Sequence, residues 1–320
     1  MPVLAWVKAV HIAASALLAG AFAFDLLVLR RIVLPAEDAV LAHDVRARLR
    51  VLAGCGVAAA AASWLAWLGM LAISMSGEPP GEALTPAVLG TVIAQTTFGH
   101  VWCLRAALIA VVAVLLLWPA GQRRASPPWI AAGLSLALAC SLAWTGHAVG
   151  TQPLHVVVDA VHLLAATVWL GMLPPLWLVI RRACARADAP STALAAAAAR
   201  LFSLPGMLAV AALALTGTGN ALWLLDAPRE LVATKYGQVL LAKLVAFALM
   251  LMLAAGNRLW FAPAAQGASS PAERLQALRR LRTSVLLEVA LGALVLALVG
   301  VLGVTAPGLH GAHAHHMEDM

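Results

Sequence analysis

Long apolar runs, separated by short polar segments, dominate this chain of 320 residues. A helix needs about 20 mainly apolar residues to cross a hydrocarbon layer about 30 Å thick. We find eight such runs, at 3–29, 50–74, 98–118, 128–147, 154–180, 201–225, 232–256 and 283–305. The pattern therefore predicts an all-α, polytopic membrane protein with eight transmembrane helices.

The composition agrees with this prediction and excludes an ordinary soluble domain. Hydrophobic residues make up 63% of the chain and charged residues 11%, whereas soluble domains carry about 25% charged residues. Two arginines, Arg30 and Arg31, follow the first apolar run. We therefore expect this run to remain in the membrane and not to be cleaved as a signal peptide.

The net charge of +7 follows from the placement of arginines between the runs. They lie in the first, third, fifth and seventh connections, at Arg30, Arg31, Arg46, Arg48, Arg50, Arg123, Arg124, Arg181, Arg182, Arg186, Arg274, Arg279, Arg280 and Arg282. The other connections hold only Arg229. Because cytoplasmic loops of membrane proteins are enriched in Lys and Arg, both termini are predicted outside, in the periplasm. The charge then reflects topology, and no nucleic acid partner is expected.

Two segments of the chain resemble each other and predict an internal repeat. Residues 8–20 read KAVHIAASALLAG and residues 159–171 read DAVHLLAATVWLG. A T-x-[F/Y]-G-x5-[R/K] pattern also starts at both Thr96 and Thr234. We expect two four-helix halves, 1–147 and 148–308, related by an axis along the membrane normal, as in parallel-repeat transporters. Chance similarity between alanine-rich helices is the alternative.

Five histidines lie in the predicted outer half of the membrane. They are the candidate metal ligands His11, His162, His155, His100 and His147. His155, Asp159 and His162 share one helix face, because they are spaced i, i+4, i+7. Imidazole suits copper and zinc, so we expect His11 and His162 to form a deep site below a layer of the other three. The alternative is that each histidine is a hydrogen-bonded packing residue.

Other polar residues within the runs are candidates for supporting that site. A carboxylate commonly orients a ligating histidine, and Asp159 is placed to do so. The further orienting or charge-balancing candidates are Lys8, Arg105, Lys243 and Asn220. Near the inner ends of the last two runs, we expect Glu288 and Arg258 to form a structural ion pair.

The tail 309–320 adds a His- and Met-rich segment, with His310, His313, His315, His316 and Met317. Such tracts bind metals on composition alone, and a cloning remnant is the alternative. The four cysteines are far apart in the sequence, so they are read as packing residues.

Sequence motifs in the second half carry a family resemblance. Between Arg200 and Pro307 the chain reads RLFS, LTGTGNA, TKYGQVLLAK, GNR and RTSVLLE in order, and DAVHLLAATVWLG lies upstream. This succession resembles the copper resistance protein D family. The resemblance implies a bacterial inner-membrane copper importer that works beside a periplasmic copper chaperone of the CopC type.

The sequence thus favours copper transport, with copper received by the outer histidines. One alternative is a membrane redox protein in which His11 and His162 bind a b-type haem or act on a quinone. Another is a copper sensor or scaffold without translocation. No enzyme activity is predicted, and the chain has no phosphate-binding loop for ATP.

Overall fold

The computed structural model describes residues 2–33, 35, 38–118, 128–145, 153–224 and 229–305, all in helices or short connections. Within these residues, seven helical stretches are long and apolar enough to cross a membrane. Their main helices are α1 (Pro2–Leu27), α2 (Ala39–Ser76), α5 (Thr97–Leu117), α7 (Pro153–Arg186), α8 (Ala189–Leu224), α10 (Lys235–Gly256) and α12 (Pro271–Leu302). The expectation of an all-α membrane protein is confirmed.

The fourth predicted run is shorter than expected in the structure. It forms α6 (Pro128–Cys140) followed by a 3-10 turn (Ser141–Thr145). An α-helix rises 1.5 Å per residue, so α6 alone is about 20 Å long, and only with the turn does it approach the thickness of the hydrocarbon layer. The structure therefore supports seven long spans, and the eighth crossing stays a prediction.

Two other differences concern the polar segments. The second connection, expected as a loop, contains α3 (Pro80–Ala83) and α4 (Pro86–Gln95), and α4 packs its apolar face on α2 and α5. In addition, α2, α8 and α12 begin 11 or 12 residues before the apolar runs that predicted them. Hydropathy detects only the part of a helix that lies in hydrocarbon, and these helices continue beyond it.

A pair of equivalent threonines begins α5 and α10. Thr96 Oγ1 accepts a hydrogen bond from Gly99 N at 2.9 Å, and Thr234 Oγ1 accepts one from Gly237 N at the same distance. Threonine hydroxyls are favoured helix caps because they satisfy free N–H groups of the first turn. The T-x-[F/Y]-G pattern found in the sequence is thus a helix start used twice.

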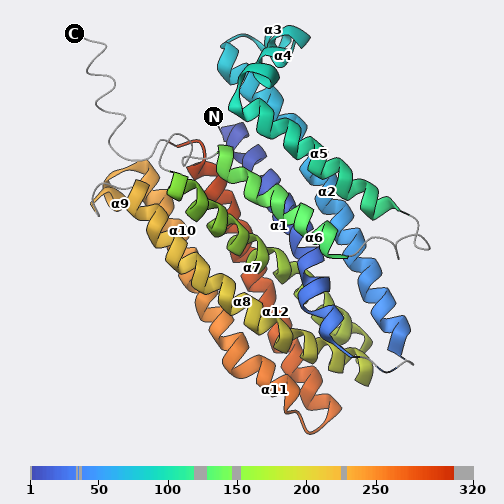
Figure 1. The fold of residues 1–320 in the computed structure, drawn as a ribbon. Helices are drawn as coiled ribbons and strands as arrows, with labels where there is room; N and C mark the ends of the chain where they lie inside the picture. Colours follow the sequence, from blue (N-terminus) through green and yellow to red (C-terminus); the bar gives the residue numbers. More distant parts are fainter. Residues whose placement is uncertain are drawn as a thin grey trace.

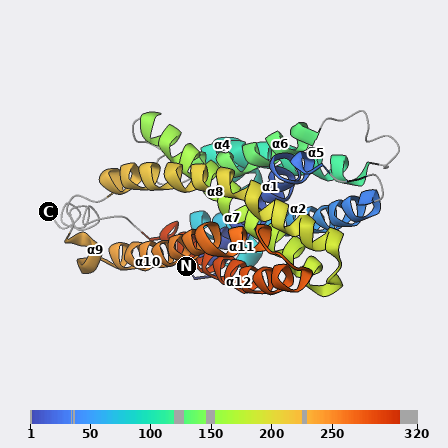
Figure 2. The ribbon, with the colours of Figure 1, turned by 90° about the horizontal axis from the view of Figure 1, so that it is seen from below.

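The helices α1 and α7 form the centre of the bundle and touch through glycines. Both are more buried than the other long helices, and Figures 1 and 2 show α10 on one side of them and α5 on the other. A Cβ atom on Gly20 would lie 2.0 Å from the carbonyl atoms of Gly171. Only glycine permits this approach. Gly20 and Gly171 are the last residues of the two similar segments of the sequence, 8–20 and 159–171.

Arginines gather at one end of the bundle, the end with α11 (Ala262–Gln266) in Figure 1. There Asp44 of α2 lies 3.2 Å from Arg182 and 3.8 Å from Arg186 of α7. Asp25 of α1 pairs with Arg30 and with Arg46 of α2. We call this end the arginine-rich end; α4 and α9 (Glu230–Ala233) lie at the opposite end.

Candidate functional site

His11 lies fully buried in α1 and is hydrogen-bonded to the neighbouring helix α2. Its Nδ1 is 3.0 Å from Ser63 Oγ. The Ser63 hydroxyl donates its single hydrogen to the carbonyl of Ala59 at 2.6 Å, so its oxygen must accept from His11. Nδ1 therefore carries the proton, and the lone pair is on Nε2, which has no hydrogen-bond partner in the described part of the chain.

His162 has the same arrangement in α7. Its Nδ1 is 2.9 Å from Thr216 Oγ1 of α8, and Thr216 donates to the carbonyl of Ala212 at 2.6 Å. The same reasoning places the proton on Nδ1 and the lone pair on Nε2. Gly217 lies beside the ring, where a Cβ atom would be 3.4 Å from Cε1. His162 is only partly buried, so it is the more accessible of the two imidazoles.

The surroundings of His11 are positively charged. Its ring meets the edge of Trp67 at 5.6 Å between centroids. The Arg105 guanidinium lies 5.0 Å from the Trp67 ring centre and the Lys8 ammonium 5.6 Å from it. Arg105 Nε donates to Ser141 at 2.9 Å and Lys8 donates to the carbonyl of Gly303 at 2.6 Å. Two fixed cations therefore oppose a further cation at this histidine.

The surroundings of His162 include a carboxylate instead. Asp159 lies three residues earlier in α7, the position that Lys8 occupies relative to His11. Its Oδ1 accepts a hydrogen bond from Asn220 Nδ2 of α8 at 3.2 Å, and its charge acts on Lys243 and Tyr236 of α10. The Lys243 ammonium acts on His162 as Arg105 acts on His11, and Asp159 offsets the charge of Lys243. His162 is therefore the histidine that has a carboxylate among its neighbouring charges.

The other candidate ligands are not joined to these two in one cluster. His155 is buried at the start of α7, and His100 is exposed at the start of α5. In the part of the chain that the structure describes, no three His, Cys, Asp or Glu side chains lie together as a metal site. His147 and the tail residues His310, His313, His315, His316 and Met317 lie outside the described residues.

The structure gives Glu288 and Arg258 other partners in place of the predicted ion pair. Glu288 Oε1 accepts a hydrogen bond from Asn257 Nδ2, and Arg258 donates to Ser203 of α8. The expectation rested on opposite charges near the ends of neighbouring helices. A π-helical segment (Asn257–Phe261) after α10 accompanies the different pairing, in which Asn257 meets the carboxylate and Arg258 turns to α8.

Sequence reasoning missed Ser63 and Trp67, which contact His11. The repeat offers a signal for Ser63, because it lies 52 residues after His11 and Thr216 lies 54 residues after His162. Extending the repeat to the second helix of each half would therefore have pointed to a hydroxyl near each histidine. Nothing comparable marks Trp67.

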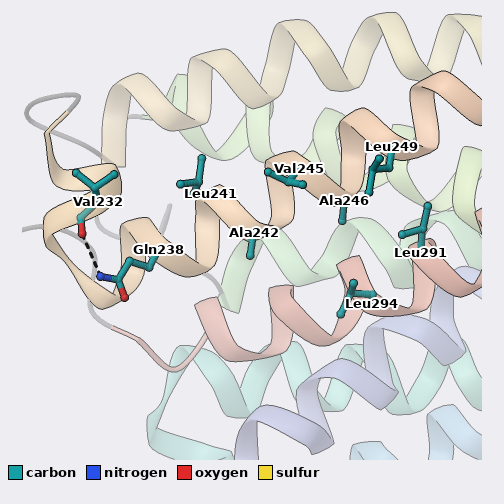
Figure 3. A pocket seen from close by; sticks show the side chains of 9 residues that line it. All are labelled: Val232, Gln238, Leu241, Ala242, Val245, Ala246, Leu249, Leu291 and Leu294. Carbon is teal, nitrogen blue, oxygen red and sulfur yellow. Dashed lines mark hydrogen bonds between the residues drawn. The ribbon is translucent and has the colours of Figure 1, made fainter.

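A groove on the surface of the bundle is apolar, and no metal ligand lines it. It has a volume of about 610 Å³ and runs between α10 and α12 (Figure 3). Aliphatic side chains line it except at one end, where Gln238 donates to the carbonyl of Val232 at 3.0 Å. Such a surface suits lipid chains rather than copper.

Comparison with known proteins assigns the chain to a family. A model described as "Copper resistance protein D-like, N-terminal domain" matches residues 1–157, and one described as "Copper resistance protein D" matches residues 196–302. Copper resistance protein D of Pseudomonas syringae pv. tomato is 31% identical over 244 residues, which are 74% of this chain and 77% of the relative. The chain belongs to the copper resistance protein D family. The resemblance stated from the sequence is thus confirmed.

Two further relatives are more distant. Copper transport protein CutJ of Bacillus subtilis (strain 168) is 28% identical over 66% of this chain and 39% of its own length. Inner membrane protein YebZ of Escherichia coli (strain K12) is 29% identical over 64% of this chain and 69% of its own length. No solved structure matches the chain.

Proposed function

We propose that this protein imports copper across the bacterial inner membrane and that His162 Nε2 receives the ion. Family membership supports copper as the substrate, since one relative is named a copper resistance protein and another a copper transport protein. The observation that carries the residue assignment is the hydrogen bond from His162 to Thr216. It fixes the ring with an available nitrogen lone pair, the form in which imidazole binds metals.

Charge favours His162 over His11 as the copper ligand. Each histidine bonds to a hydroxyl group on the next long helix, but Asp159 lies three residues before His162 and Lys8 three residues before His11. A carboxylate close to a ligating histidine stabilises the bound cation and orients the ring. His11, with Lys8 and Arg105 around Trp67, is then the weaker ligand of the deep site. Its hydrogen bond to Ser63 also holds α1 against α2.

The two ends of the bundle support the proposed direction of transport. His155, His162 and His100 lie toward the ends of α7 and α5 that are remote from the arginine-rich end. Positive residues favour the cytoplasmic side, so the histidines open to the periplasm, where both termini also lie. Copper then reaches His162 from a periplasmic chaperone of the CopC type.

The two-half organisation is part of the same proposal. The equivalent residues Gly20 and Gly171 meet between α1 and α7, and α1 and α7 each carry a histidine that bonds to the following long helix. A pseudo-two-fold axis through this crossing relates the halves 1–147 and 148–308. The tail 309–320 acts as an additional copper-capturing segment.

Copper uptake into proteoliposomes tests the proposal. We expect His162→Ala to lower copper affinity by at least the roughly 10–100-fold that loss of a ligand's hydrogen-bonding partner commonly costs. His11→Ala should have a smaller effect, and His43→Ala, on an exposed face near the arginine-rich end, should have none. Full uptake by His162→Ala would refute the assignment. Copper binding without uptake would indicate a sensor or scaffold, and a haem absorption band would indicate the redox alternative.

A further inference from the structure

A buried carboxyl group lies away from His162, on α12, where it contacts the residue that follows α10. Glu288 of α12 is 2% exposed. Its Oε1 accepts a hydrogen bond from Asn257, an uncharged partner. None of the ion pairs formed by the described residues includes Glu288. A carboxylate in a membrane-spanning helix without a cation partner is strongly disfavoured relative to its neutral, protonated form.

The described elements packed against α12 do not supply a cation that pairs with Glu288. α12 contacts α1, α7, α8, α10, α11 and the π-helical segment. The titratable residues described on these elements have other contacts or lie exposed: Lys8, His11, Asp25, His155, Asp159, His162, Arg181, Arg182, Cys184, Arg186, Arg200, Lys235, Tyr236, Lys243 and Arg258. Glu288 can therefore change protonation without breaking an ion pair.

Two further polar atoms are buried in this region without a partner. Asn257 Oδ1 and Ser284 Oγ make no hydrogen bond within the described residues. Ser284 is 6% exposed and lies four residues before Glu288 on the same face of α12. Buried polar atoms are nearly always hydrogen-bonded. These two atoms, beside a carboxyl group, therefore indicate a site at which a polar species binds.

The backbone at Asn257 is also unusual. Asn257 begins the π-helical segment Asn257–Phe261, and π-helical turns inside helices are rare and frequent at functional sites. The local distortion and the Glu288 contact therefore occur at the same residue.

We propose that Glu288, together with Asn257 and Ser284, is a proton-binding site whose protonation is coupled to copper movement. The carboxylate takes up one proton and becomes a neutral carboxylic acid, and release of that proton restores the ion held by the Asn257 amide. This inference rests on the proposed function, because the coupling needs copper transport. It identifies the proton as the second transported species.

Infrared titration of the purified protein in lipid vesicles tests the proton site without any copper. We expect a carboxylic acid C=O band that titrates in the wild type and in Glu78→Gln, an exposed control, but is lost in Glu288→Gln. In Asn257→Leu the band should remain and titrate at higher pH, because the donor to the ionised form is gone. A spectrum of Glu288→Gln that keeps every titrating band of the wild type would overturn the site, and Asn257→Leu keeps the test usable should Glu288→Gln not fold.

Vesicles that contain a pH dye and a copper dye test the coupling. Wild-type protein should change internal pH as copper enters, and Glu288→Gln should lose both the pH change and the dependence of copper uptake on a pH gradient. Unaltered proton movement with copper in Glu288→Gln would overturn the coupling. If the wild type moves no copper, the proposed import fails, whereas the infrared titration still decides whether Glu288 binds a proton.

Discussion

The contact between Gly20 and Gly171 makes a quantitative prediction for Gly20→Ala. The added Cβ atom would lie 2.0 Å from the carbonyl carbon and oxygen of Gly171, whereas ordinary contacts begin near 3.4 Å. Neither of these backbone atoms can rotate away, so α1 and α7 must separate by about 1.5 Å. Overpacking of this kind costs typically 1–3 kcal/mol, and the separation also weakens the neighbouring contacts. We expect Gly20→Ala to lower the stability of the folded protein by about 3 kcal/mol.

Heating the purified protein in detergent and measuring the folded fraction by size-exclusion chromatography tests this value. Gly54→Ala, on α2, is the matched control, because nothing lies within 4 Å of the Cβ atom that it adds. Alanine is the better helix former by about 1 kcal/mol, so the control should equal or exceed the wild type. Equal thermal stability of Gly20→Ala and Gly54→Ala would refute the close crossing at the centre of the bundle.

Three further predictions concern the ligand, the tail and the arginine-rich end. Thr216→Val should weaken copper binding by about 10–100-fold, because the proton on His162 Nδ1 loses its acceptor. Thr216→Ser keeps the hydroxyl group and should bind copper as the wild type does. Equal copper affinities of the two variants, measured by competition with a copper chelator, would contradict the reasoning. Deletion of 309–320 should reduce copper uptake at low copper and leave the maximal rate nearly unchanged, and complete loss of uptake would show that the tail is essential. Asp44→Asn should lower the stability of the folded protein by at most about 1 kcal/mol in a thermal unfolding assay, since the arginine partners of Asp44 are solvent-accessible. The loss should be smaller at high salt, and a larger loss that does not depend on salt would contradict the reasoning.

Hydropathy and charge predicted the membrane class and most of the spans, because a hydrocarbon solvent imposes a length on each helix. The predicted run 98–118 is α5 within one residue at each end. The helical extensions of α2 and α12 were missed because their turns contain several arginines and are polar. The extension of α8 was missed because its alanine-rich turns are less hydrophobic than the run that follows. The shortened α6 could not be foreseen, since an apolar run does not reveal where an α-helix changes to a 3-10 turn.

The candidate site was predicted only in part, and the reason is physical. The sequence repeat singled out His11 and His162, and both rings are found in equivalent hydrogen bonds. Helical periodicity gives the face on which a side chain lies, but not the partner that another helix brings to it. Ser63, Trp67 and the pairing of Asn257 with Glu288 therefore required the three-dimensional structure.

X-ray absorption at the copper edge of the purified, copper-loaded protein tests the central claim most directly. The method reports imidazole nitrogens around copper in either oxidation state. With the copper-capturing tail 309–320 deleted, we predict an imidazole signal in the otherwise unchanged protein and in His43→Ala, and its loss, together with most of the bound copper, in His162→Ala. A His162→Ala protein that keeps its full copper content and the unchanged imidazole signal would show that copper is bound elsewhere.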